Sequence, residues 1–155
     1  MGKEQGKKGK HLFLHGAFVL AALLLSAGCA TSEGIQRKWQ GYKHVDQAEK
    51  LMEQGKYAEA LTHSEEALRL WPEDSPGDIA LFHMGLVWAH PNNPQKNYEK
   101  ALECFERLVH EFPRSTLSEE AGVWIGVTKE LICCKGKTRD LQETVSALRK
   151  ELDVF

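Results

Sequence analysis

The sequence predicts an all-α fold, a stack of about three helical hairpins that follows a short N-terminal targeting segment. Two observations predict it. First, two segments match at an offset of 41 residues, which aligns Tyr57 with Tyr98 and Pro72 with Pro113. Second, apolar residues in both segments recur at i, i+3, i+4 and i+7, so they lie on one face of a helix. Self-similarity at such a period is typical of paired helices that bury their apolar faces by stacking.

The N-terminal segment has the pattern of a secretory signal peptide. A lysine-rich head over residues 3–10 is followed by an apolar run over residues 12–25, and small residues then lead to Cys29. The run is shorter than the ~20 residues that a membrane-spanning helix usually needs. We therefore expect residues 1–28 to be a cleaved signal peptide, and the alternative is an uncleaved N-terminal anchor.

The residues around Cys29 refine this interpretation. Ser26-Ala27-Gly28-Cys29 resembles the bacterial lipobox, and it departs from that pattern at Ser26, where the family usually has leucine. The resemblance implies that Cys29 carries lipid and becomes the first residue of the mature chain, which would attach the protein stably to a membrane. Ala30, in place of an aspartate, favours sorting to the outer membrane. Residues 29–40 would then form a lipidated linker.

The remaining residues, 41–155, have a suitable length for one small helical domain. The net charge of the chain is −2, which gives no electrostatic case for a nucleic-acid partner. We expect the first hairpin to run from Val45 to Pro72, with a turn at Gln54-Gly55-Lys56. Proline ends its second helix because the residue before proline is pushed out of the α region.

The second hairpin is expected to begin at Ser75-Pro76, which suits a helix cap followed by proline at the first helical position. Residues 90–97 form its loop, which we expect to hold no core residue. A third unit would follow, entered by a capping box at Thr116 and Glu119.

The C-terminal segment allows two interpretations. Residues 135–139 break the helical pattern, and apolar residues then recur from Leu141 to Leu152 at spacings of four, three and four. This segment is either the closing helix of the third hairpin or a helix for dimerisation or docking.

Together these repeats resemble the tetratricopeptide repeat (TPR), a helical-hairpin motif. The matching positions are Gly55, Tyr57, Ala60, Ala67, Pro72, Met84, Gly85, Trp88, Ala101, Phe105 and Pro113. The resemblance implies a groove lined by the first helix of each unit, able to hold a peptide or helix of a partner protein. Its central residues would be Phe82, Leu86, Val123 and Val127. The alternative is that the C-terminal helix or the segment next to the lipid covers them.

No catalytic motif or cofactor-binding fingerprint is present, so we expect a protein that is not an enzyme and needs no cofactor. His83 and His90 could share a helix face, but no third ligand lies near them, so no metal site is expected. Stacking would bring Cys104 near Cys133 and Cys134. A disulfide could join Cys104 to one of them, or all three could be buried free thiols.

The expected function is therefore a lipid-anchored TPR scaffold or adaptor that binds an envelope protein or peptide at the periplasmic face of the bacterial outer membrane. Similar architecture occurs in BamD-like assembly lipoproteins and in QseG-like lipoproteins linked to signalling. The alternative is a structural spacer or self-assembling envelope lipoprotein that dimerises through Leu141–Leu152.

Overall fold

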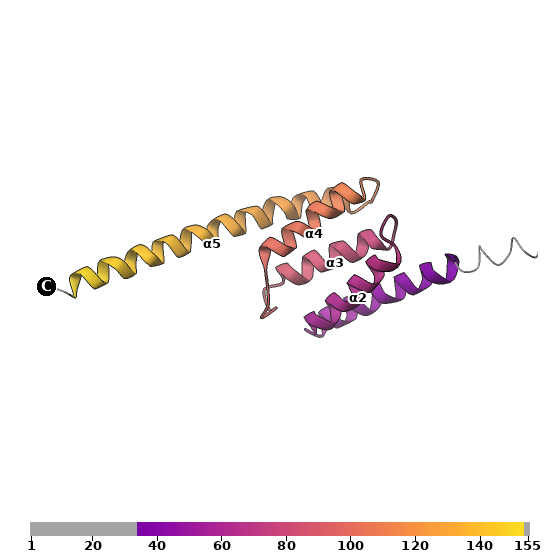
Figure 1. Cartoon of the computed structure of the whole chain (residues 1–155), viewed down its shortest axis with the longest axis horizontal. Coiled ribbons are helices and arrows are strands. Elements are labelled where there is room, and N and C mark those ends of the chain that lie inside the picture. Colours follow the sequence, from indigo (N-terminus) through magenta and orange to yellow (C-terminus); the bar gives the residue numbers. More distant parts are fainter. Residues whose placement is uncertain (1–33, 154–155) are drawn as a thin grey trace, which may run out of the picture. The chain divides into compact units, whose positions relative to one another are not determined.

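The computed structural model describes residues 34–153, in which all regular structure is helical (Figure 1). The first helix is described from residue 34 to residue 53, and it is followed by α2 (Tyr57–Leu70), α3 (Gly77–Ala89), α4 (Tyr98–Glu111) and α5 (Ser118–Leu152). Residues from 40 onward belong to one compact unit and residues 34–39 to a separate one. The expected signal peptide, its apolar run and Cys29 lie outside the described residues.

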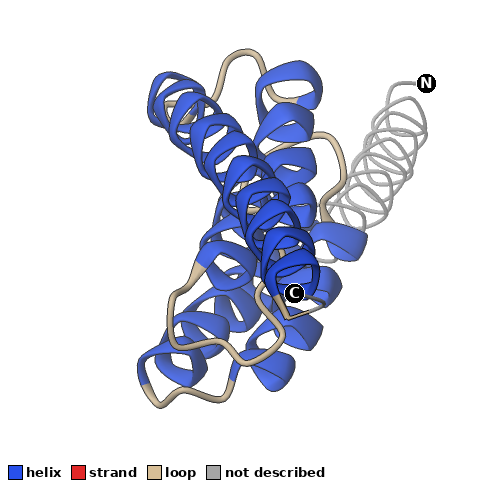
Figure 2. Ribbon diagram, turned by 90° about the vertical axis from the view of Figure 1, so that its left-hand side faces the viewer, coloured by secondary structure: helices blue, strands red, loops and turns tan. Residues whose placement is uncertain are grey.

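The helices pack in chain order. α2 packs on α3, α3 on α4 and α4 on α5, so consecutive helices lie side by side. Figure 2 shows the same helices after a turn of 90°, with only loops between them. The predicted fold class, an all-α stack of helical hairpins, is confirmed for the residues described.

The turn of the first hairpin lies where the sequence predicted it. Gly55 has a φ of 73°, in the left-handed region that glycine adopts without a steric penalty. The N–H of Gly55 donates to Met52 O at 2.9 Å, and the N–H of Lys56 donates to Leu51 O at 2.8 Å. These two bonds form a Schellman motif, which satisfies the carbonyls at the end of the first helix and sends the chain back along it.

The second hairpin differs from the prediction in two details. α3 begins at Gly77 with Pro76 at its cap position, one residue later than expected. Its loop does contain a core residue, because Asn93 is only 3% exposed. The Asn93 side chain donates to Val87 O at 2.9 Å and accepts from the N–H of Gln95 at 2.9 Å. One amide therefore ties the end of α3 to the loop that follows it.

The third unit is where the prediction was wrong. Residues 135–139 do not break the helix, since α5 is one continuous helix of 35 residues, and within residues 34–153 no later helix folds back on it. The segment contains glycine but no proline, and a glycine inside a helix costs only about 1 kcal/mol relative to alanine. The capping box at Thr116 and Glu119 is also absent: Leu117 occupies the cap position and has no side-chain cap bond.

The core between the second hairpin and α5 is aromatic. Phe105, fully buried on α4, meets Phe82 edge to face at a centroid distance of 5.7 Å. Phe105 also stacks on Trp124 of α5 at a centroid distance of 5.8 Å. A Cβ atom at Gly85 would lie 2.5 Å from the Phe105 ring, so a residue without a side chain is needed there for α3 and α4 to approach. Phe105 is therefore the residue on which α3, α4 and α5 converge.

Candidate functional site

The predicted groove is not formed as expected, because its residues lie in two different environments. Phe82 is 7% exposed and belongs to the core around Phe105, and Leu86 is half-buried against the same core. Val123 and Val127 of α5 are exposed. The reason lies in α3, which is packed between α2 and α4 and is apolar on most of its surface, so Phe82 is taken up by the core. The assignment of Phe82 to an open binding surface was therefore wrong.

The three cysteines of the described chain are free thiols, so the disulfide considered for Cys104 is not formed. Cys104 is buried in the core of the first and second hairpins, and burial raises the pKa of its thiol to about 11. Cys133 and Cys134 are exposed on α5. Cys104 is thus a small core residue, whereas the expectation that all three are buried was wrong for the other two.

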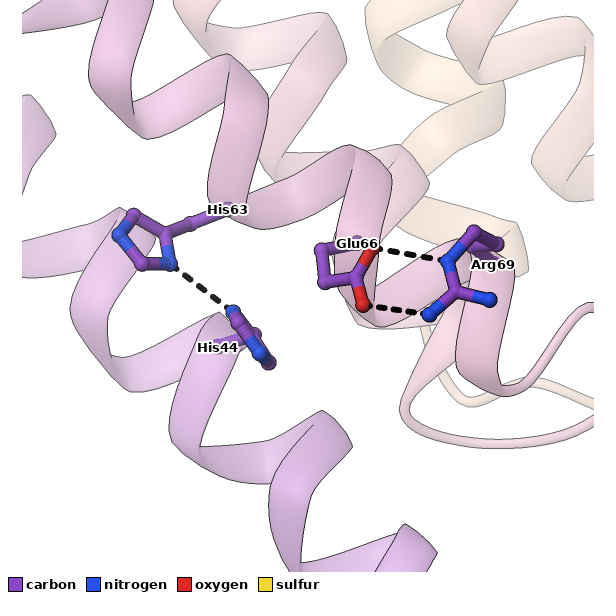
Figure 3. Close-up of polar contacts among 4 residues, drawn as sticks. All are labelled: His44, His63, Glu66 and Arg69. Atoms are coloured by element: carbon purple, nitrogen blue, oxygen red, sulfur yellow. Dashed lines mark hydrogen bonds and ion pairs between the residues drawn. The ribbon is translucent and has the colours of Figure 1, made fainter.

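Two histidines of the first hairpin face each other. The Nδ1 atoms of His44 and His63 lie 2.9 Å apart, on the two helices that the Gly55 turn joins (Figure 3). One ring nitrogen must donate and the other accept, so at least one of these rings is neutral in this contact. This pair was not among the residues predicted from the sequence. A weak signal was present, because both residues lie two to three helical turns from Gly55 on the helices that it joins, and antiparallel helices bring such residues near one another.

Next to this pair, Arg69 and Glu66 form a two-bond ion pair (Figure 3). The Arg69 Nε and Nη2 atoms donate to the two carboxylate oxygens at 2.8 and 2.6 Å. The side-chain hydrogen bond from Arg69 lowers the pKa of Glu66 below its ordinary value. Both side chains are exposed and three residues apart on α2, so the pair is ordinary helix-surface chemistry of small energetic weight.

Two further histidines, His83 and His90, are held within the fold. The Nδ1 atom of His90 lies 2.9 Å from the hydroxyl oxygen of Tyr57, which fixes the end of α3 against the start of α2. The Nδ1 atom of His83 is buried without a hydrogen-bond partner, and burial lowers the pKa of His83. Within residues 34–153, no three metal-ligating side chains gather in a geometry that could hold an ion.

An open cleft of about 710 Å³ lies between the loops that precede α3 and α5. Inside it, Ser115 donates a hydrogen bond from Oγ to Asp78 Oδ2 at 2.6 Å. Ser115 Oγ also accepts from the N–H of Leu117 at 3.1 Å. The serine therefore joins the loop before α5 to the first turn of α3, and no histidine lines the cleft to activate it as a nucleophile.

The surface feature that stands out is the C-terminal half of α5. Every residue from Lys137 to Asp153 is exposed. In Figure 1 this half extends past the helices on which α5 packs. The exposed fractions of its large apolar side chains are 66% for Leu141, 48% for Val145, 55% for Leu148 and 73% for Leu152. These residues lie on one stripe of the helix, so the structure leaves the stripe uncovered in the described chain.

Packing on α4 ends close to the start of that helix. Lys129 of α5 pairs with Glu106 of α4 at 2.9 Å between Nζ and Oε1. One turn and a half further on, the Lys135 Nζ atom lies 5.9 Å from the ring centroid of Tyr98, the first residue of α4. The helix that supports α5 stops there, and α5 continues alone.

No protein-family model, curated protein or solved structure matches this chain. The likeness to TPR lipoproteins therefore stands on the sequence motifs alone. In the described part of the chain, no helix has both the length and the apolar character needed to cross a membrane.

Proposed function

We propose that this chain is a non-catalytic, lipid-anchored scaffold at the periplasmic face of the bacterial outer membrane. Two parts support the proposal separately. The lipobox-like Ser26-Ala27-Gly28-Cys29 supports the anchor. The projecting half of α5 supports an interaction role, because a helix that leaves four large apolar side chains in solvent gains stability when a partner covers them.

The interaction surface in this proposal is α5, and it replaces the groove predicted from the sequence. Phe82 and Leu86 already contribute to the core, whereas Leu141, Val145 and Leu148 have no cover within the described chain. The observation that carries the proposal is this uncovered stripe. Either a partner protein or a second copy of the chain could cover this stripe, so an adaptor and a self-assembling scaffold are the two candidate functions, with a role in envelope assembly or signalling.

The anchor is tested by metabolic labelling with palmitate in a Gram-negative host that expresses the full chain. The parent should incorporate label, lose residues 1–28 and fractionate with the outer membrane. Cys29→Ser should incorporate no label and remain uncleaved. Cys133→Ser is the matched control, since it removes an exposed cysteine of the domain and should behave as the parent. Labelled, processed Cys29→Ser in the outer-membrane fraction would refute the anchor.

A further inference from the structure

The exposed stripe on α5 is longer than the segment noticed in the sequence. Stepping back from Leu141 by three and four residues in turn gives further exposed positions. The complete stripe, called here the seam, is Val127, Leu131, Cys134, Thr138, Leu141, Val145, Leu148 and Leu152. All of these side chains are exposed. An alternation of three and four sustained over this length is the a/d pattern of a coiled coil, with Leu131 at an a position and Cys134 at a d position.

We propose that the seam is the interface of a parallel two-stranded coiled coil between the α5 helices of two copies of this chain. The inference deepens the proposed function, because it rests on α5 as the interaction surface, but it does not require the lipid anchor. The occupant of the seam is then a second copy of α5 in register.

The seam begins where packing inside one chain releases the helix. Trp124 would be the next a position toward the N-terminus, but it stacks on Phe105 of α4. The side chains of α5 that are buried in the stack, Ala121 and Thr128, lie on a different face from the seam. Val127 is adjacent to Thr128, about 100° around the helix, and it is 43% exposed. The stack and the seam therefore use neighbouring faces of α5, and Leu131, Cys134 and Thr138 of the seam border an open cleft between α5 and the start of α4.

The residue types in the seam favour two parallel strands. A β-branched residue at a with leucine at d favours the parallel dimer, and here Val145 at an a position lies between Leu141 and Leu148 at d positions. Thr138 is a polar residue at an a position. Polar residues there disfavour shifted registers, in which they would face an apolar neighbour of the other helix.

Charges beside the seam also favour the parallel orientation. In a parallel pair, Glu130 at a g position faces Lys135 at the following e position of the second copy, once on each side of the dimer. In an antiparallel pair aligned over the whole seam, Glu130 would face Glu151 instead. Opposite charges attract in the first arrangement and like charges repel in the second. The remaining facing pairs in the parallel arrangement are Lys137 with Gln142 and Thr144 with Arg149. Each pair contains only one charged residue, so neither pair attracts or repels by charge.

Cys134 supplies a direct test of this register. In the parallel dimer each Cys134 faces its own counterpart across the seam, within the roughly 4.4–6.8 Å between Cα atoms that a disulfide spans. Cys133, equally exposed, occupies a c position that points away from the seam. The two neighbours therefore form a matched pair, one inside the proposed interface and one outside it.

The experiment treats whole cells that express the full chain with diamide and examines dimers on non-reducing gels. Diamide oxidises two thiols to a disulfide by accepting two electrons and two protons, so it links cysteines that already meet. The parent and Cys133→Ser should give a dimer band, and Cys134→Ser should lose it. No band in the parent, a band that survives Cys134→Ser, or a band that depends on Cys133 would each overturn the proposal. Palmitate labelling is read separately, so a failed anchor and a failed coiled coil are told apart.

Orientation is tested by charge reversal in the same assay, with the chain diluted in detergent. Glu130→Lys should weaken the parallel dimer about tenfold, because two attractive pairs become repulsive. Lys135→Glu added to it should restore the dimer. In an antiparallel pair Glu130→Lys would strengthen dimerisation by facing Glu151, so the direction of the effect decides between the two orientations.

Discussion

Residues 118–136 and 137–153 of α5 belong to one continuous helix but differ in their surroundings. The first half buries Ala121 and Thr128 and stacks Trp124 on Phe105. The second half buries nothing in the described chain. Most helical stability in proteins comes from the packing of an apolar face, so the second half depends on continuation from the first and, in our proposal, on a second copy. The comparison shows that the hairpin core fixes where α5 begins but does not fix how far it continues.

The largest expected effects come from two substitutions, one in the packed stack and one in the projecting half of α5. Phe105→Ala should destabilise the stack by about 3–5 kcal/mol, because it leaves a cavity where α3, α4 and α5 converge. Leu148→Asp should change the unfolding free energy of the monomer by less than about 0.5 kcal/mol, since Leu148 is exposed there, but it should abolish the dimer. Urea unfolding at low protein concentration and diamide cross-linking measure the two effects.

The matched control for this pair is Ala147→Asp, which places the same charge one residue away, at a c position. It should leave both the unfolding free energy and the dimer unchanged. If Ala147→Asp abolished cross-linking as fully as Leu148→Asp, charge on the helix rather than the seam would be responsible, and the distinction between the two halves would lose its support.

The sequence was sufficient to predict the packed region and less informative about the projecting one. The repeat placed the Gly55 turn and the prolines after α2 and α4 correctly, because local backbone chemistry decides turns and stops. The composition of residues 135–139 predicted a break in the helix, because glycine and charged residues interrupt the apolar pattern there. A solvent-exposed helix needs no apolar pattern to continue, so this signal was misread.

The groove failed for a different physical reason. Periodicity tells which residues share a helix face, but it does not tell how many faces of that helix are covered. α3 has neighbours on two sides, so Phe82 is buried although it lies on the face that the TPR resemblance assigned to a ligand. Asn93 was missed similarly, because its burial depends on the folded loop and leaves no apolar signal in the sequence.

A smaller effect contrasts a closely packed glycine of the stack with an open glycine of α5. Gly85→Ala should destabilise the stack by about 1–3 kcal/mol, because the new Cβ would lie 2.5 Å from the Phe105 ring. Gly122→Ala, on α5, meets no atom within 4 Å and should stabilise the helix by about 0.4–1 kcal/mol. Thermal unfolding followed by circular dichroism checks both variants. Equal effects of the same sign would show that the approach of α3 to α4 is looser than the structure indicates.

The smallest expected effect is a pH dependence confined to the stack. Burial lowers the pKa of His83, which the charge of Glu49 only partly offsets, whereas the unfolded chain titrates this residue near its ordinary value of about 6.5. Below that pH the unfolded state binds a proton that the folded state does not, so stability falls on acidification, by at most about 1.4 kcal/mol per pH unit for this residue. His83→Gln should reduce the slope of the unfolding free energy between pH 7 and pH 5, and an unchanged slope would assign it to other groups. Residues 137–153 contain no histidine. At each pH and a fixed diamide exposure, the yield of dimer cross-linked through Cys134 should therefore be the same for the parent and for His83→Gln.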